Sequence, residues 1–242
     1  NDPHGRRFGE AAGAYERGRP DYPAGIVDWL LEGHPRRMVE LGAGTGKLTR
    51  ALVGRVGSLV AVEPDAGMRA AFAQVLPDVD VLPGSGEHIP LDNHSAEAVV
   101  ASQAWHWVDP RLAELEVARV LVPGGFLGLV WNDRDETDAW IAELSVMLEE
   151  FGTSPDAGYR PELGQLFSPM ETIEIPWTHV ASEDAVVDMV ASRSYVIALG
   201  EADRRALLDR VRAHARAAAV ATGEVPVRYV TRGYRARTAA VS

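Results

Sequence analysis

The sequence predicts an α/β fold in which a doubly wound parallel sheet carries helices on both faces. Five short apolar runs alternate with amphipathic segments over residues 36–132. Four of these runs are apolar almost without interruption, as expected of parallel strands that are covered on both faces. A glycine-rich turn follows the first run, where a strand gives way to a helix. This alternation of strands and helices implies one parallel sheet with right-handed crossovers.

The elements of the first half follow from these runs and from residues that start or stop helices. Asp65 precedes one helical pattern, and Asp109 followed by Pro110 precedes another. Val-Pro-Gly-Gly at 122–125 predicts a sharp stop before the next strand. The predicted strands are 37–41, 58–63, 79–82, 96–102 and 126–131, and the predicted helices are 48–56, 65–76 and 110–121.

The second half also contains strand-like and helix-like segments, and it shows no internal repeat. A chain of 242 residues has the length of one large domain. We expect a single domain with an amino-terminal arm and helix (1–35), a cofactor-binding core (36–135) and a C-terminal half (136–242). In that half, helices are predicted at 138–152, 183–191 and 201–221, strands at 171–181 and 225–236, and a Gly-, Pro- and Ser-rich loop reaches residue 169.

Composition argues against several classes of protein. The net charge of −11 disfavours a nucleic-acid surface, which needs clustered positive charge. The Arg- and Ala-rich helix near 210–219 is flanked by acids, which indicates a solvated face. The absence of cysteine excludes a disulfide framework, a thiolate zinc site and a cysteine nucleophile. No apolar run approaches about 20 residues and the amino terminus lacks a signal-peptide core, so we expect a cytoplasmic protein without nucleic-acid or membrane partners.

A glycine turn and an acid point to a nucleoside cofactor. The turn at 39–46 reads Val-Glu-Leu-Gly-Ala-Gly-Thr-Gly, and glycine lets the backbone press against a ligand because it has no Cβ. Glu63 ends the next apolar run, about 20 residues beyond the first glycine, where a carboxylate can accept hydrogen bonds from both ribose hydroxyls. Ligands of such sheets bind beyond the carboxyl ends of the strands. We therefore expect one crevice to gather the segments 40–46, 63–65, 84–87, 103–107 and 132–135.

The spacing of the glycines separates two classes of cofactor. Dinucleotide sites favour G-x-G-x-x-G with a pyrophosphate on the helix N-terminus, whereas this turn reads G-x-G-x-G. Glu40, two positions before Gly42, would repel a pyrophosphate but would help to hold an ammonium group. This favours a cofactor with an amino-acid tail. An NAD-dependent oxidoreductase and a non-catalytic cofactor-binding regulator remain the alternatives.

Four segments occur together in the order known from one family. They are Glu-Leu-Gly-Ala-Gly-Thr-Gly at 40–46, Val-Glu-Pro-Asp-Ala-Gly-Met at 62–68, Gly-Ser-Gly-Glu-His-Ile-Pro-Leu at 84–91 and Arg-Val-Leu-Val-Pro-Gly-Gly at 119–125. The sequence resembles the class I S-adenosylmethionine-dependent methyltransferases of the type 11 group. The resemblance implies a Rossmann-like, seven-stranded sheet whose last strand is antiparallel, with the strands at 171–181 and 225–236 as the final pair. It also implies S-adenosylmethionine as cofactor, S-adenosylhomocysteine as product and no metal.

The same resemblance implies roles for individual residues. The glycine turn passes under the methionine portion, Glu63 binds the ribose, Met68 packs near the adenine, and Gly86 with Glu87 lines the adenine edge. The cofactor-binding residues implied are Tyr15, Arg19, Glu40, Gly42, Ala43, Gly44, Gly46, Glu63, Pro64, Met68, Ser85, Gly86, Glu87, Ser102 and Gln103.

Other segments resemble one branch of this family. Phe8, Tyr15 and Arg-Gly-Arg-Pro-Asp-Tyr-Pro at 17–23, together with 103–109 and 130–135, are similar to small-molecule methyltransferases that include the trans-aconitate methyltransferases. This implies an arm that folds over the cofactor and a small-molecule acceptor, and leaves the oligomeric state open. We expect a substrate cap from the arm, 152–169 and 183–200, since loops on a rigid scaffold carry specificity. The substrate residues expected are Tyr22, Trp105, His106 and Trp131.

Aromatic residues and one histidine suit methyl transfer. Transfer from a sulfonium is an in-line displacement, so the protein has to align the reactants and exclude water. Trp105, Trp107 and Trp131 offer ring faces that attract the positive charge, with a core position as the alternative for each. His106 is the catalytic candidate because its ordinary pKa suits removal of a proton near neutrality, and positioning of the acceptor is its alternative role.

Charged residues near the predicted strand ends suggest two further roles. Arg19 and Arg134 are suited to pair with an anionic acceptor or with the cofactor carboxylate, with a plain surface position as the alternative. The acidic cluster at 133–138 offers oxygen ligands of the kind that magnesium prefers. A solvated loop and helix start explain that cluster more simply, so we expect no metal.

Overall fold

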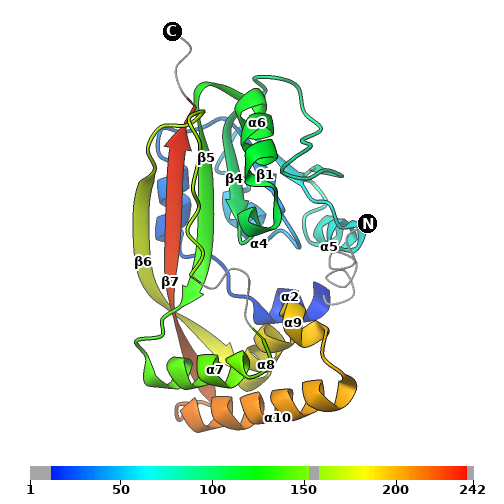
Figure 1. Cartoon of the computed structure of the whole chain (residues 1–242), viewed down its shortest axis with the longest axis vertical. Coiled ribbons are helices and arrows are strands. Elements are labelled where there is room, and N and C mark those ends of the chain that lie inside the picture. The colour runs from blue at the N-terminus through cyan, green and yellow to red at the C-terminus, as the bar shows by residue number, and fades with distance from the viewer. Residues whose placement is uncertain (1–11, 153–157, 239–242) are drawn as a thin grey trace.

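A seven-stranded mixed sheet organises the molecule (Figure 1). The computed structural model describes residues 12–152 and 158–238, so that Phe8, the rest of 1–11 and the cap residues 153–157 lie outside the described residues. In spatial order the strands are β3 (Val81–Leu82), β2 (Ser58–Val62), β1 (Arg37–Leu41), β4 (Ala96–Ser102), β5 (Leu121–Arg134), β7 (Glu224–Arg237) and β6 (Glu171–Ser182). Strand β7 is antiparallel to β5 and β6, and the other neighbouring pairs are parallel. The expected α/β sheet with an antiparallel last strand is confirmed.

Alternate residues of the central strand β4 face two different helical layers. Val99 and Ala101 belong to the core cluster that includes α6 (Pro110–Val120). Ala98 and Val100 belong to the cluster formed with α3 (Ala24–Leu30) and α4 (Lys47–Leu52). Because successive strand residues point to opposite faces, β4 is buried on both sides, which explains its unbroken apolar sequence.

Caps fix the starts of the helices that follow the strands. The Asp65 carboxylate accepts a hydrogen bond from the Met68 N–H at 2.8 Å and begins α5 (Ala66–Val75). Asp109 accepts from the N–H groups of Arg111 and Leu112 at the start of α6. Both predicted caps are confirmed, because an N-cap acid satisfies amide groups that have no partner within the helix.

A second helical layer covers the carboxyl end of the parallel strands (Figure 1). It contains α2 (Ala12–Gly18), α7 (Ala139–Glu149), α8 (Glu183–Ala191), α9 (Ser194–Ile197) and α10 (Glu201–Ala218). Helices α7, α8 and α10 share a core with one end of β7, in which Leu144, Val190 and Val211 are fully buried. Helix α2, which precedes the first strand in sequence, and the helices of the second half thus meet at the carboxyl ends of the parallel strands, where a ligand is expected.

Helix α2 lies so close to α8 that only glycine fits at one position. A Cβ on Gly18 would lie 2.1 Å from the Met189 N and 2.3 Å from the Asp188 carbonyl carbon. The Arg17 Nε donates to Asp188 at 2.6 Å beside this contact. The backbone of the amino-terminal arm therefore packs directly against the backbone of α8 in the cap.

We expect Gly18→Ala to displace α2 from α8, because the new methyl group meets rigid backbone atoms. Hydrogen exchange of the α2 amides should rise at least tenfold, whereas Gly13→Ala should leave it unchanged or slower. Gly13 is the matched control on the same helix, since among the described residues its Cβ would meet only the flexible Arg17 Nη1, at 3.4 Å, and alanine favours a helix. Equal exchange rates in the two variants would contradict the close packing of α2.

Several boundaries differ from those predicted. Strand β5 begins at Leu121 rather than at residue 126, and Pro123 to Gly125 are accommodated where the β4–β5 register shifts between Ala96 and Ala98. The helix does stop before this strand, since α6 ends at Val120, but the strand starts five residues earlier than predicted because its pairing with β4 continues through the irregularity. Strand β3 has two residues, and α10 ends at Ala218. Over residues 12–152 and 158–238, none of the helices combines the length and apolar character that crossing a membrane requires.

Candidate active site

The glycine turn leaves β1 with a backbone that other residues could not adopt without strain. Gly42, Gly44 and Gly46 have φ angles of 63°, 57° and 89°. A Cβ on Gly42 would lie 2.5 Å from the Ala104 Cβ, so this glycine allows two loops to approach. A Cβ on Gly44 would meet no atom of the described residues within 4 Å. The backbone of Gly44 is thus open to a ligand.

Glu63 joins the glycine turn to the end of β2. Its Oε2 accepts a hydrogen bond from the Gly44 N–H at 2.9 Å, and its Oε1 accepts from the Asp65 N–H at 2.9 Å. The side chain is buried, and burial raises its pKa against the opposing effect of these two backbone hydrogen bonds. Each carboxylate oxygen retains a lone pair for a further donor, as two ribose hydroxyls require. The two features from which a nucleoside cofactor is inferred are therefore in contact.

Glu40 lies beneath the turn in a buried hydrogen-bond network. The Thr49 hydroxyl donates to its Oε2 at 2.5 Å, and the Ser102 hydroxyl donates to its Oε1 at 3.4 Å. Burial raises the pKa of Glu40 to about 7. Tyr22 on the arm hydrogen-bonds to Ser102, and its own pKa is raised by burial. The network thus connects the arm to the floor of the expected cofactor site.

Residues expected near the adenine lie at the ends of β2 and β3. Met68 is buried at the start of α5, and the carbonyl oxygen of Pro64 accepts from the Arg69 guanidinium. The Ser85 N–H donates to the His88 carbonyl at 3.0 Å, and Glu87 accepts from the Asp109 N–H at 2.8 Å. These contacts shape the loop that follows β3. One oxygen of the Glu87 carboxylate is thereby bound to the N–H of Asp109, the residue that caps α6. Gly86 allows this packing, since a Cβ there would lie 2.9 Å from Val108 Cγ1.

An aromatic cluster surrounds His106, which lies in the short helix η1 (Trp105–Trp107). The Trp131 Nε1–H donates to His106 Nδ1 at 3.4 Å. The ring centroid of Tyr159 is 5.9 Å from that of His106 and 5.3 Å from that of Trp131. Trp105 is buried in the main core and Trp107 is half-exposed, so the structure places the tryptophans in three different environments.

The arm closes over a small enclosed cavity at the strand ends. Its volume is about 20 Å³, which is room for roughly one water molecule. The Gln103 Nε2 donates to the Asn132 carbonyl at 3.1 Å, and the Asn132 Nδ2 donates to the Asp21 carbonyl of the arm at 3.1 Å. Gln103 has a φ of 53°, a strained angle for a residue with a side chain. The lining residues are Tyr15, Arg19, Pro20, Tyr22, Lys47, Gln103, Asn132, Arg193 and Tyr229.

Lys47, Tyr159, Arg193 and Tyr229 have no individual role in the sequence interpretation. Lys47 directly follows the glycine turn, a position that signals proximity to the ligand, and its Nζ lies 3.5 Å from Asp21 of the arm. The other three have no local motif. Arg193 and Tyr229 line the cavity from the cap and from β7, and Tyr159 packs on the main core beside Trp131 and His106.

The acidic cluster after β5 is paired with arginines. Asp133 forms an ion pair with Arg232, and Asp135 with Arg228 at 3.4 Å. Asp138 caps α7 by accepting from the Trp140 N–H. Within residues 12–152 and 158–238, no group of three or more His, Cys, Asp or Glu side chains has the arrangement of a metal site.

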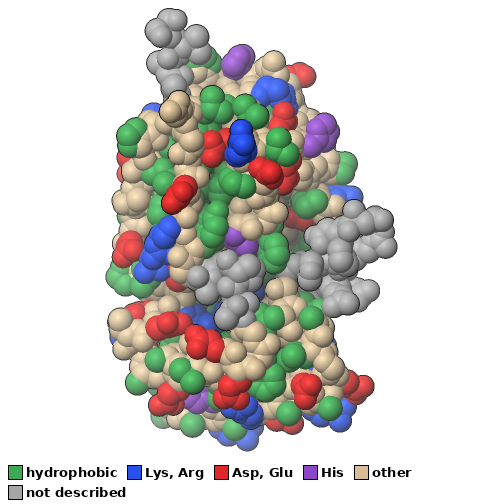
Figure 2. Space-filling model, viewed as in Figure 1, with side chains coloured by type: hydrophobic (Ala, Val, Ile, Leu, Met, Phe, Trp, Pro, Cys, Tyr) green, Lys and Arg blue, Asp and Glu red, His purple; other side chains and the backbone are tan. Residues whose placement is uncertain are grey.

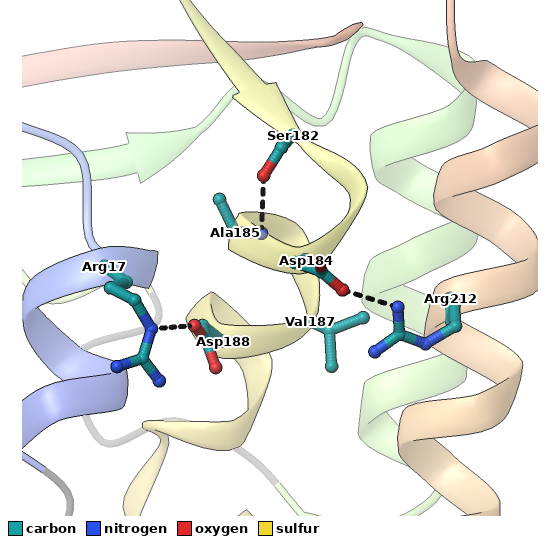
Figure 3. Close-up of a pocket in the computed structure, with 7 residues that line it drawn as sticks. All are labelled: Arg17, Ser182, Asp184, Ala185, Val187, Asp188 and Arg212. Atoms are coloured by element: carbon teal, nitrogen blue, oxygen red, sulfur yellow. Dashed lines mark hydrogen bonds and ion pairs between the residues drawn. The ribbon is translucent and has the colours of Figure 1, made fainter. Parts of the chain in front are cut away.

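A larger hollow of about 540 Å³ opens at the surface between α2, α8 and α10 (Figure 3). Arg17 pairs with Asp188 and Arg212 with Asp184, both at 2.6 Å. The charged side chains of this hollow are thus paired with one another, and none of the expected site residues lines the hollow. Acidic and basic side chains are also interspersed over the face shown in Figure 2. The candidate site remains the one at the strand ends.

Comparisons with known proteins agree with this fold. A model of the methyltransferase domain matches residues 39–129, from the turn through β5. An uncharacterized methyltransferase of Mycobacterium tuberculosis is 48% identical over 205 residues, which cover 85% of this chain and 84% of that protein. The chain belongs to the class I S-adenosylmethionine-dependent methyltransferases. The fold of this methyltransferase family implies that it binds S-adenosylmethionine.

Two further relatives bear on this methyltransferase. The trans-aconitate 2-methyltransferase of Rhodopseudomonas palustris is 29% identical over 215 residues, covering 80% of this chain and 82% of that enzyme. A solved structure of a type II methyltransferase from Anaeromyxobacter dehalogenans superposes with a TM-score of 0.61 at 26% identity, over 92% of this chain and 97% of the other. The likeness therefore extends beyond the cofactor half into the cap.

Proposed function

We propose that this methyltransferase transfers a methyl group from S-adenosylmethionine directly to a small-molecule acceptor. The observation that supports it most is the contact between the Glu63 carboxylate and the Gly44 amide, beside open space at the strand ends. The arm covers the strand ends beside this turn, where its residues line the small cavity with those of the sheet, and such a covered site favours a small acceptor over a macromolecule.

The cofactor fits the residues present. Gly44 offers an unobstructed backbone to the methionine portion, and Glu63 accepts from the ribose hydroxyls. Glu40 acts on the ammonium group through its buried network. Arg19 on the arm is suited to the carboxylate of the tail. The other proposed contacts are Tyr15, Gly42, Ala43, Gly46, Pro64, Met68, Ser85, Gly86, Glu87, Ser102 and Gln103.

In the proposed reaction the protein aligns the partners and excludes water. Bound S-adenosylmethionine supplies an electrophilic methyl carbon on a sulfonium. A lone pair of the acceptor forms the new bond to the methyl carbon as the carbon–sulfur bond breaks. The electron pair of the carbon–sulfur bond stays on the sulfur of the departing S-adenosylhomocysteine. Trp131 and Tyr22 contribute the walls of the acceptor side, and Trp105 supports them from the core. This in-line course needs alignment rather than a covalent intermediate.

The hydrogen bond from Trp131 favours a positioning role for His106. Since Nδ1 accepts the Trp131 N–H, a neutral imidazole carries its proton on Nε2. That Nε2–H can hold an acceptor oxygen but cannot take a proton from it. A hydroxyl acceptor would need a change of tautomer for His106 to act as its base.

Isothermal titration with S-adenosylmethionine tests cofactor binding, and we expect a dissociation constant well below 1 mM. Incubation with labelled cofactor and a metabolite extract should then yield S-adenosylhomocysteine and one labelled small product. Absence of heat at millimolar cofactor would contradict the proposal. Enhanced NADH fluorescence would instead favour an oxidoreductase, and binding without product would favour a regulator.

A further inference from the structure

The side-chain carbonyl oxygen of Gln103, directly after β4, is buried and has no hydrogen-bond partner within residues 12–152 and 158–238. Gln103 lines the cavity under the arm, and its Nε2 donates to the Asn132 carbonyl at 3.1 Å. Because a carbonyl can only accept, this bond fixes which end of the Gln103 amide carries the oxygen, Oε1. Burying an acceptor without a donor is costly, so a ligand that brings a donor would stabilise this arrangement.

Buried hydrogen bonds hold the residue to which the Gln103 amide is bound. The Trp177 Nε1–H donates to the Thr231 hydroxyl at 2.7 Å, and this hydroxyl donates to Asn132 Oδ1 at 2.6 Å. Since an indole can only donate, the direction of both bonds is fixed, and the Asn132 Nδ2 is left to donate to the Asp21 carbonyl of the arm at 3.1 Å. Thr231 is fully buried. Strands β6 and β7 and the arm thus hold Asn132 together, and Asn132 in turn fixes the position of Gln103 Oε1.

The Gln103 side chain extends toward β5, away from the strand that carries the glycine turn. In the sheet, β1 and β2, which carry the glycine turn and Glu63, lie on one side of β4, and β5 and β7 lie on the other. The Gln103 N–H donates to the Val130 carbonyl of β5 at 2.9 Å, and Tyr229 of β7 lines the same cavity. Gln103 Oε1 is therefore placed toward the acceptor, and the contact with the cofactor proposed above falls to the Gln103 backbone.

The charge around the cavity favours a neutral donor over a cationic one. Burial raises the pKa of Tyr229, and the charges of Arg134, Arg19 and Arg193 act against this rise, so the cavity lies in a positive potential. A positive potential disfavours an ammonium and favours the neutral amine, which has an N–H to donate and a lone pair to share. A carboxylate has no hydrogen for Oε1. A hydroxyl has one but needs a base, and His106 in the tautomer described above already carries its proton on Nε2.

We propose that the methyl acceptor is a neutral amine whose N–H donates to Gln103 Oε1. This proposal rests on the proposed methyltransferase function. The lone pair of the nitrogen forms the bond to the methyl carbon, the electron pair of the carbon–sulfur bond stays on sulfur, and the methylated nitrogen keeps its hydrogen as an ammonium that later loses a proton to water. Gln103 takes no proton and acts by orienting the lone pair. Since the cavity holds about 20 Å³, the amine enters when Asp21 of the arm moves away from Asn132.

Sinefungin and S-adenosylhomocysteine are matched probes of this position, because sinefungin carries an amine where the cofactor carries its methyl group. In isothermal titration we expect the wild type to bind sinefungin about tenfold more tightly, since the amine donates to Gln103 Oε1. Gln103→Met has a similar length but no acceptor, and should lose this preference while its affinity for S-adenosylhomocysteine stays within about threefold. Gln103→Glu keeps an acceptor but cannot donate to Asn132, and should retain the preference. Gln74→Met, at an exposed position of α5, is the control and should behave as the wild type.

Two results would overturn the proposal. One is an undiminished preference in Gln103→Met, and the other is an equal loss in Gln103→Met and Gln103→Glu, which would show that the side chain acts only by holding Asn132. The labelled product from the metabolite extract is a second measurement, which decides the matter if Gln103→Met does not fold. A methyl group on nitrogen supports the proposal, and a methyl group on oxygen, carbon or sulfur overturns it. A protein that binds neither probe contradicts the proposed function itself, whereas one that binds both equally contradicts only the role of Gln103.

Discussion

Replacing Glu63 with alanine is expected to weaken S-adenosylmethionine binding by about 1–3 kcal/mol, or roughly 5- to 150-fold. The loss has two causes. The ribose hydroxyls lose their charged acceptor, and the Gly44 N–H loses the partner that fixes the turn. Isothermal titration of the folded variant measures the effect, with circular dichroism to verify the fold.

Glu97→Ala is the matched control for this prediction. Glu97 also accepts a backbone hydrogen bond, from the Arg36 N–H at 2.7 Å, but it does so at the opposite end of the sheet. Its removal should leave cofactor affinity within twofold of the wild type. If Glu63→Ala binds as tightly as Glu97→Ala, the ribose is not held at the end of β2.

Glu40 should make the stability of the protein fall between pH 4.5 and 7. Its pKa is about 7 in the folded protein, above its ordinary value of 4.5, so the folded state binds more protons than the unfolded state in this window. The free energy of unfolding therefore loses about 3 kcal/mol as pH rises through the window. Glu40→Gln removes this slope. Its stability relative to wild type should thus rise by a similar amount from pH 4.5 to pH 7, as measured by urea unfolding.

Glu174→Gln provides the comparison for Glu40, because Glu174 is exposed on β6 and pairs with Arg232. Its stability difference from wild type should be nearly independent of pH above 5. A flat difference for Glu40→Gln as well would show that the Glu40 carboxyl group titrates normally. Cofactor binding should depend on the same group, since an ammonium favours ionised Glu40 and the wild type should bind more tightly at pH 8 than at pH 6.

Features that depend on neighbouring residues in the chain were predictable from the sequence. The Asp65 and Asp109 caps are confirmed because a cap requires one side chain next to the helix that it starts. The contact of Glu63 with the glycine turn follows from two adjacent parallel strands that end at the same edge. The antiparallel final strand came from the family resemblance, because no local pattern specifies strand direction.

Features that depend on tertiary packing were not predictable. Strand β5 continues through Pro123 and Gly124 because its pairing with β4 tolerates a register shift. Tyr159 and Arg193 reach the site from cap segments without a motif. Trp105 lies in the core, since the turn of η1 directs its indole away from the surface that exposes Trp107. Each outcome is decided by contacts between segments distant in sequence.

The position of β7 has a consequence for biosynthesis. This last strand lies between β5 and β6 and pairs with both along most of its length. While a ribosome is still making residues 224–237, β6 has no neighbour in the sheet and the second half of the molecule cannot close. We expect the β6 edge to stay unpaired, and so to be a target for chaperones, until residues 224–237 have emerged from the ribosome.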